Sequence, residues 1–159
     1  MSYVLGNEKK YDGCIFESAP EQTYDRDMLV LLRDNSTVVM LNRFPYANGH
    51  LLVAPSRHVA GLEDLDSDEA ALLIEQVRNS TAILKKTLRP NGFNIGLNLG
   101  EVAGAGIADH LHFHVIPRWH GDHNFMTTVA DIRTIPEHID QTFNRLLDDF
   151  QNLLDPQAA

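Results

Sequence analysis

The chain has 159 residues, of which 43% are hydrophobic, and this length and composition predict one globular domain spanning residues 1–159. Its formal net charge of -9 argues against a nucleic-acid-binding surface. The single cysteine, Cys14, excludes an intrachain disulfide and suits a reducing compartment. The first residues lack the basic and apolar regions of a signal peptide, and no apolar run is long enough to cross a bilayer. We therefore expect a cytoplasmic protein with no membrane partner.

Alternating apolar residues and turn-forming residues predict the strands. An N-terminal arm, residues 1–11, precedes a domain core of about residues 12–155. Asp34-Asn35-Ser36 separates two β-branched runs and is typical of a hairpin turn. Pro55 stops the third run, and a small-residue loop at 100–108 precedes the last one. The predicted strands are residues 28–33, 37–42, 50–54, 93–99 and 109–118.

Two helices are expected. Asp66 or Ser67 can cap a helix over residues 67–88, which Pro90-Asn91-Gly92 would end. A second helix is expected to begin near Pro136, because proline favours the first helical position. This order of elements predicts an α+β fold with an antiparallel sheet of about five strands and two main helices. The apolar stripe expected on the first helix is Ala70, Leu73, Ile74, Val77 and Leu84.

The most informative segment is residues 110–116, where His110, His112 and His114 alternate with apolar residues. On a strand, this spacing puts three imidazoles on one face. Three interpretations follow: a polar strand face, a zinc site that uses two of these histidines and a third one, or nucleophilic attack by His112 on phosphorus. The preceding loop is rich in glycine, which allows backbone amides to approach a phosphate closely, and this favours the third interpretation.

The histidine segment resembles the signature of the histidine triad (HIT) superfamily of nucleotide hydrolases and transferases. Residues 49–55, 57–59 and 94–98 resemble its upstream strands, so the resemblance covers about residues 12–128. Residues 117–122, with Asn124-Phe125, are most similar to the dinucleoside polyphosphate branch, which includes fragile histidine triad hydrolases and bacterial diadenosine tetraphosphate phosphorylases. The resemblance implies a HIT-like fold, a homodimer with a continuous sheet, and cleavage at an α-phosphate through a nucleotidyl-histidine intermediate.

The resemblance also implies site residues. His112 would be the nucleophile, His110 and His114 would surround the phosphate, and His50 would support them. The same resemblance implies a ribose or base contact by Asn42, an α-phosphate or leaving-group contact by Asn98, a phosphate cradle of backbone amides at Gly104, Ala105, Gly106 and Ile107, and an apolar base cleft of Leu41, Phe44 and Leu52. Relatives often carry polar side chains where this chain has Gly106 and Ile107, a departure that disfavours an amine leaving group.

The resemblance implies no cofactor held by the protein, although magnesium can arrive with the substrate. Some bacterial members bind zinc through Cys-x-x-Cys and two histidines. In this chain Cys14 is the first of these residues, Glu17 stands in place of the second cysteine, and His58 and His110 are the two histidines. We expect this site to be an empty remnant. The alternative functions are a purine nucleoside phosphoramidase of the same superfamily, a zinc-binding protein that uses the alternating histidines, and a nucleotide-binding module without turnover.

Overall fold

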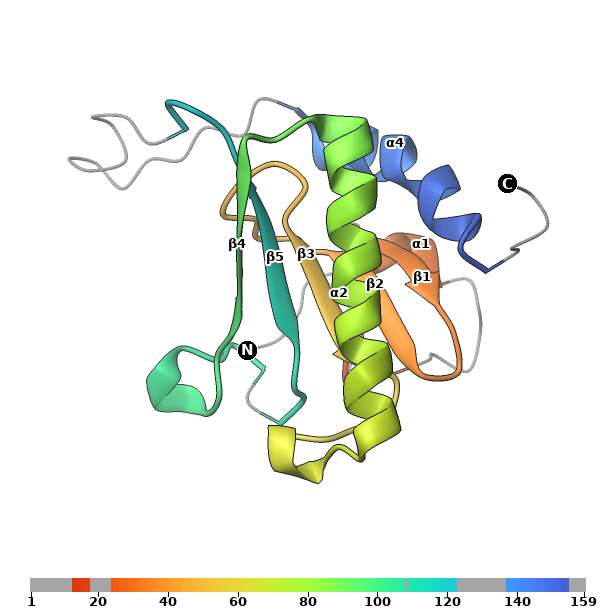
Figure 1. Ribbon diagram of the computed structural model, residues 1–159, viewed down its shortest axis with the longest axis vertical. Coiled ribbons are helices and arrows are strands. Elements are labelled where there is room, and N and C mark those ends of the chain that lie inside the picture. The colour runs from red at the N-terminus through yellow and green to blue at the C-terminus, as the bar shows by residue number, and fades with distance from the viewer. Residues whose placement is uncertain (1–12, 18–23, 108, 123–136, 155–159) are drawn as a thin grey trace.

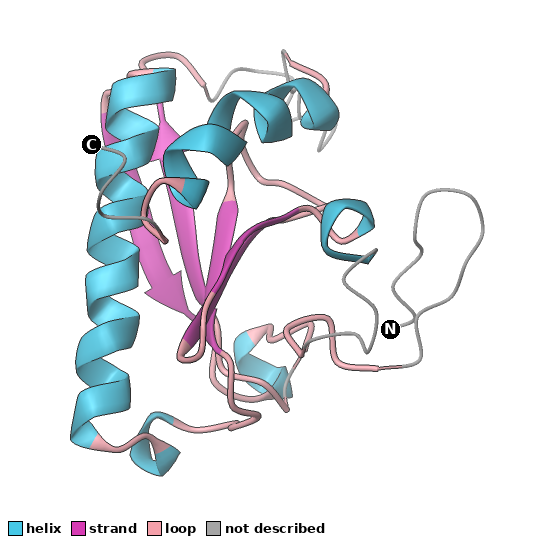
Figure 2. Ribbon diagram, turned by 90° about the vertical axis from the view of Figure 1, so that its right-hand side faces the viewer, coloured by secondary structure: helices cyan, strands magenta, loops and turns pink. Residues whose placement is uncertain are grey.

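The computed structural model describes residues 13–17, 24–107, 109–122 and 137–154. A five-stranded sheet forms its centre, with every neighbouring pair antiparallel. Two helices, α2 (Ser67–Leu88) and α4 (Ile139–Gln151), cover one face of this sheet (Figures 1 and 2). The sheet order is β1-β2-β3-β5-β4, where β1 is Val30–Arg33, β2 Thr37–Leu41, β3 Leu51–Pro55, β4 Gly92–Leu97 and β5 Phe113–Arg118. The predicted α+β fold is confirmed.

The two faces of the sheet pack against different parts of the chain. One hydrophobic cluster joins the sheet to α2 and α4, through residues such as Leu84 and Phe150. A smaller cluster lies on the other face, where Ile15 and Phe16 pack against Met40 and Leu52. Strands β2 and β3 are buried along their whole length because both faces are covered, which explains their nearly continuous apolar sequences. The short helix α1 (Tyr24–Asp27) precedes β1.

Helix α2 has its predicted bounds. Asp66 is the N-cap and forms a capping box with Glu69, and the left-handed Arg89 (φ 50°) ends the helix. Leu73, Val77 and Leu84 of the predicted stripe are buried, whereas Ala70 is half-buried. Ile74 is 56% exposed, so its assignment to the buried stripe is wrong. The buried face instead continues through Gln76, Ser80 and Ile83.

The predicted histidine strand begins later than expected. Strand β5 starts at Phe113, because its pairing with β3 ends where Val53 meets Phe113. Of the triad, only His114 therefore lies within a regular strand. The alternation of faces persists beyond the strand, since Leu111 and Val115 are buried in the cluster under α2. Two short 3-10 helices, η1 (Leu62–Asp64) and η2 (Glu101–Ala103), lie in the connecting loops, and η2 occupies part of the predicted small-residue loop.

The last helix, α4, begins at Ile139 with His138 as its N-cap. The predicted start near Pro136, the N-terminal arm at 1–11 and Asn124-Phe125 lie outside the described residues. Phe143, Leu146 and Phe150 form the buried face of α4. None of the described helices is long and apolar enough to cross a membrane.

Candidate functional site

Four histidines gather where β3 and β5 lie side by side. His50 immediately precedes β3, and His114 pairs with Leu52 within the β3–β5 ladder. The ring centroids of His112 and His114 lie 5.0 Å apart, and Nε2 of His50 lies 2.9 Å from Nδ1 of His114. His50, His110 and His112 are buried, with at most 4% exposure. The structure thus brings together the four histidines that the sequence singled out.

The proton positions on His50 and His114 follow from their partners. The backbone N–H of Tyr46 donates to Nδ1 of His50 at 3.1 Å, and the amide nitrogen of Asn42 lies 3.3 Å from the same atom. Because a backbone N–H is only a donor, neutral His50 must carry its proton on Nε2. This N–H donates to Nδ1 of His114, so neutral His114 carries its own proton on Nε2. The ring of His114 therefore presents an N–H donor on the side opposite His50.

The backbone carbonyl of His110 determines the tautomer of His112. Nδ1 of His112 lies 2.8 Å from this oxygen, which can only accept, so the proton of the neutral ring is on Nδ1. Nε2 of His112 then keeps its lone pair. His110 has the opposite arrangement, because its Nε2–H donates to the Pro55 carbonyl at 2.9 Å. Its Nδ1 lies 3.1 Å from Sγ of Cys14, whose thiol can donate to it.

Burial keeps these histidines neutral near pH 7. It is the largest cause that lowers the pKa of His112 and His110 below the ordinary value. Burial, and then the neighbouring His112, lower the pKa of His114 to about 4. The pKa of His50 is lowered to about 3 by burial, followed by the charges of His114 and His112. A neutral His112 with a free Nε2 lone pair is the form required of a nucleophile.

The predicted phosphate loop is partly closed on itself. Asn98 follows β4, and its side-chain N–H donates to the Gly104 carbonyl at 3.3 Å. The backbone N–H groups of Gly104 and Ala105 donate to carbonyls of residues 101 and 100, at 2.9 and 3.3 Å. These two amides close the η2 turn, so the prediction of a phosphate cradle narrows to Gly106 and Ile107 in this loop conformation. Gly104 adopts φ 89°, a conformation that favours glycine.

The predicted base cleft needs one correction. Leu41 pairs with Leu51, and both belong to the cluster under α2. Leu52 lies in the cluster on the opposite face, so Leu41 cannot line the same cleft as Leu52. Phe44 is 63% exposed. Met40 pairs with Leu52 and belongs to the same cluster, so Met40, rather than Leu41, lies on the same face of the sheet as Leu52.

Two aromatic residues contact the histidines without having been singled out. The Phe16 ring lies 4.9 Å from that of His110 and 5.1 Å from that of His112, between ring centroids. Tyr46 stacks on His50 at 5.0 Å. The position of Tyr46 in the loop just before His50 was a usable signal. Phe16 had none, because the N-terminal segment carries no periodic pattern that predicts where it packs.

A second cluster lies beside His110 and involves all four residues of the zinc hypothesis. Cys14, His58 and His110 each place one ligand atom within 4.8 Å of the others. Glu17 instead accepts a hydrogen bond from Nδ1 of His58 at 2.9 Å, which leaves Nε2 of the neutral His58 ring as the nitrogen able to bind a metal. A thiol and two imidazoles suit zinc, so these residues fit the ion, with Glu17 behind His58 rather than among the ligands.

The fold and the histidine cluster agree with a family comparison. A family model described as HIT domain matches residues 24–121, which is more than half of the chain. The chain therefore belongs to the histidine triad (HIT) family. A similar solved structure is a hypothetical histidine triad nucleotide-binding protein from Sulfolobus tokodaii, with TM-score 0.64 and 27% sequence identity over 79% of this chain and 85% of that one.

Some of the similar proteins have functional names. An AP-4-A phosphorylase from Mycobacterium tuberculosis is 44% identical over 126 residues, which cover 79% of this chain and 64% of the relative. An asymmetrical bis(5'-nucleosyl)-tetraphosphatase from Schizosaccharomyces pombe is 34% identical over 93 residues, which cover 58% of this chain and 50% of the relative. The matched region is thus less than two thirds of either relative's length.

Proposed function

We propose that this chain cleaves dinucleoside polyphosphates, such as diadenosine tetraphosphate, at an α-phosphate. The observation that carries this proposal is the geometry of His112, whose Nδ1 proton is donated to a carbonyl while Nε2 keeps its lone pair. The 44% identity to a relative named AP-4-A phosphorylase supports the substrate class. The hydrolase name of the second relative supports the same bond but a different second acceptor.

Two substitutions at phosphorus make up the reaction. Nε2 of His112 attacks the α-phosphorus, and a P–N bond forms as the P–O bond to the remaining nucleoside polyphosphate breaks. The Nε2–H of His114 supplies a donor to the phosphate or leaving oxygen, with His50 behind it. Water or inorganic phosphate then attacks the nucleotidyl group and releases His112. Asn98 and the amides of Gly106 and Ile107 would hold phosphate oxygens, Asn42 would contact the nucleoside, and any magnesium would enter with the substrate.

The products formed from diadenosine tetraphosphate test this proposal. With inorganic phosphate, phosphorolysis yields ADP and ATP, whereas hydrolysis yields AMP and ATP. We expect His112→Asn to abolish either reaction, and the exposed His138 provides a matched control, His138→Asn, that retains activity. Absence of nucleotide products under both conditions would contradict the proposed function.

A second candidate function is metal binding, favoured by the 4.8 Å grouping of Cys14, His58 and His110. Three protein ligands would leave one tetrahedral position of zinc open. Titration with Co²⁺ should produce a thiolate-to-metal absorption band at one equivalent, and Cys14→Ser should remove it. Binding of one equivalent of Co²⁺ without a thiolate band would place the metal elsewhere, because Cys14 is the single cysteine of the chain. Of the triad histidines, only His110 belongs to such a group among the described residues.

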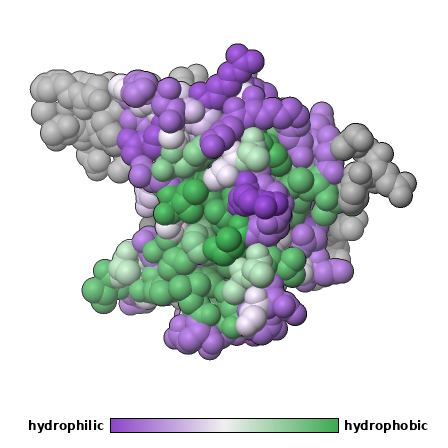
Figure 3. All heavy atoms as spheres, in the orientation of Figure 1, coloured by the Kyte–Doolittle hydropathy of each residue, from purple (hydrophilic) through white to green (hydrophobic). Residues whose placement is uncertain are grey.

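We also propose a homodimer that forms along the outer edge of β4, which has no neighbouring strand among the described residues. This outer strand leaves Ile95 47% exposed, and Leu72 and Ile74 of α2 are 47% and 56% exposed. Figure 3 shows hydrophobic side chains gathered on this face of the molecule, over β4 and beside α2. Pairing of two β4 strands would extend the sheet across both copies and cover these side chains.

A further inference from the structure

We infer that Arg57 is a positioning residue for His110 and His112, the first two histidines of the triad. It acts through the turn at residues 55–59, which joins β3 to the loop before α2. The inference extends the proposed function to a residue outside the histidine cluster, and its kinetic test rests on that function. A second test below uses the ligand-free protein, so the two ideas can fail separately.

His110 and His112 are not held by strand pairing. The β3–β5 ladder ends at Val53 and Phe113, whereas His110 and His112 precede it. Two hydrogen bonds hold this segment instead. The Leu111 N–H donates to the Val59 carbonyl at 2.7 Å, and Nε2–H of His110 donates to the Pro55 carbonyl at 2.9 Å. Pro55 is the last residue of β3 and begins the 55–59 turn, and Val59 ends this turn, so its conformation contributes to where the His110 carbonyl meets Nδ1 of His112.

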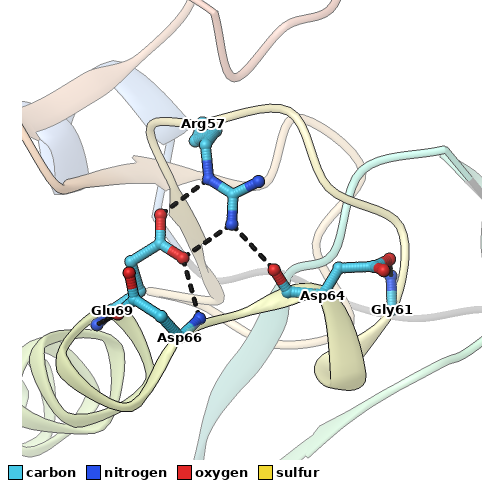
Figure 4. Close-up of polar contacts among 5 residues, drawn as sticks. All are labelled: Arg57, Gly61, Asp64, Asp66 and Glu69. Carbon is cyan, nitrogen blue, oxygen red and sulfur yellow. Dashed lines mark hydrogen bonds and ion pairs between the residues drawn. The ribbon is translucent and has the colours of Figure 1, made fainter.

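Two neighbouring structures brace this turn. On one side, Ser56 donates its backbone N–H to the Ser36 carbonyl at 2.8 Å and its hydroxyl to the Asp34 carbonyl at 3.1 Å. On the other side, Nε and Nη2 of Arg57 donate to the two carboxylate oxygens of Glu69 at 2.7 and 2.6 Å (Figure 4). Nη2 also donates to the Asp64 carbonyl at 2.8 Å. The turn is thus tied both to the β1–β2 hairpin and to the start of α2.

Glu69 is a rigid anchor for this guanidinium. Its carboxylate accepts the Asp66 backbone N–H at 3.0 Å, and its own N–H donates to the Asp66 side chain at 2.8 Å. Glu69 therefore belongs to the capping box of a 22-residue helix, and by its spacing it lies at the N-terminal end of the face that carries the buried Leu73 and Gln76. Figure 4 shows Arg57 reaching from the turn to this first helical turn.

The exposure of the pair argues for an orienting role rather than a large contribution to stability. The side chains of Arg57 and Glu69 are 53% and 25% exposed, and ion pairs in such surroundings stabilise folds little. A bidentate guanidinium–carboxylate pair, however, restricts orientation strongly because both planar groups must align. Loss of the pair should therefore displace the histidines without unfolding the chain.

A double-mutant cycle on the rate of nucleotidyl-His112 formation tests the mechanism. Arg57→Gln and Glu69→Gln should each slow this step by about 10- to 100-fold, with KM nearly unchanged, because small misplacements of reacting groups cost this much. The double variant should be no slower than either single one, since both remove one interaction. Glutamine at 69 preserves the capping box, and Arg57→Lys, which lacks the planar fork, should not restore the rate.

The control is Arg78→Gln, which removes another exposed arginine–glutamate pair, Arg78–Glu75, from the same helix and should leave the rate unchanged. If Glu69→Gln keeps the parental rate, or if the two effects multiply in the double variant, Arg57 does not act through Glu69 and the inference is overturned.

The ligand-free test measures proton exchange by NMR. The Nε2–H of His110 and the Nδ1–H of His112 should exchange with water about tenfold faster or more in Arg57→Gln, with the urea midpoint unchanged. Unchanged exchange would overturn the inference. Faster exchange in a protein that forms no nucleotidyl adduct would support the positioning role and reject the proposed function.

Discussion

Three of the four clustered histidines have one ring nitrogen held by a backbone group that can act in only one way, and the fourth, His114, takes its tautomer from His50. The Tyr46 amide can only donate to His50, and the carbonyls of Pro55 and His110 can only accept from His110 and His112. Burial keeps the rings neutral, so one set of tautomers results. The spacing of the triad led to the prediction that His112 is the nucleophile, but it did not indicate these tautomers. They depend on the backbone conformation next to His50 and His112 and, for His110, on the distant Pro55 carbonyl.

Replacement of His50 tests the donor that reaches His114. His50→Leu removes the Nε2–H that holds Nδ1 of His114, and we expect single-turnover adduct formation to slow by about 100-fold. His50→Gln keeps an amide donor at this position and should recover part of the rate. Equal rates in the leucine and glutamine variants would show that His50 only fills space.

The histidine cluster should also make stability depend on pH. The pKa values of His50 and His114 are lowered to about 3 and about 4 from 6.5, so between these values and 6.5 the unfolded chain binds more protons than the folded one. The free energy of unfolding should therefore fall as the pH drops from about 6.5 to about 4. Urea denaturation across this pH range should show that the free energy of unfolding declines less steeply for His50→Gln than for the parent protein. A free energy of unfolding that does not change with pH in the parent protein would contradict the lowered pKa values of His50 and His114.

At the scale of elements, the turn before β3 carries His50 and depends on glycine. Gly49 adopts φ 71°, and a Cβ atom there would lie 2.5 Å from Cδ1 of Leu88. Gly49→Ala should lower the free energy of unfolding by about 1–3 kcal/mol, through backbone strain and the forced movement of Leu88. Gly92→Ala is the matched control, because no atom lies within 4 Å of its added Cβ. Similar urea midpoints for both variants would contradict this account.

Elements with local signals were predictable from the sequence. Helix α2 was one, because Asp66, Glu69 and an apolar stripe all lie within it. The start of β5 was not, since it depends on where the pairing of β3 with β5 ends, at Val53. The role of the 55–59 turn was equally hidden, because its contacts to residues 110 and 111 cross more than 50 positions of sequence.

At the scale of the whole molecule, the proposed homodimer pairs two copies along β4, whose outer edge has no neighbouring strand among the described residues. Ile95→Asp places a charge on the apolar face beside this edge and should convert the proposed dimer to monomers. Light scattering after size exclusion measures the change, and Leu154→Asp, at an exposed position after α4, serves as the control. A parent protein that is already monomeric at micromolar concentration would contradict the dimer proposal.

The family and the sheet were predictable for the whole molecule, whereas the packing of its N-terminal segment was not. Cys14 and Phe16 contact the triad from nearly 100 positions away, although the described residues around them, 13–17, form no helix or strand. Such contacts depend on the assembled sheet, so sequence spacing could not reveal them.

The most direct test of the central claim is the mass of the intact protein, quenched soon after mixing with diadenosine tetraphosphate. We predict an adduct of one AMP group, mapped to the peptide that contains His112 and absent from His112→Asn. An adduct on a different residue, or turnover by His112→Asn at the parental rate, would contradict the assignment of His112 as the nucleophile.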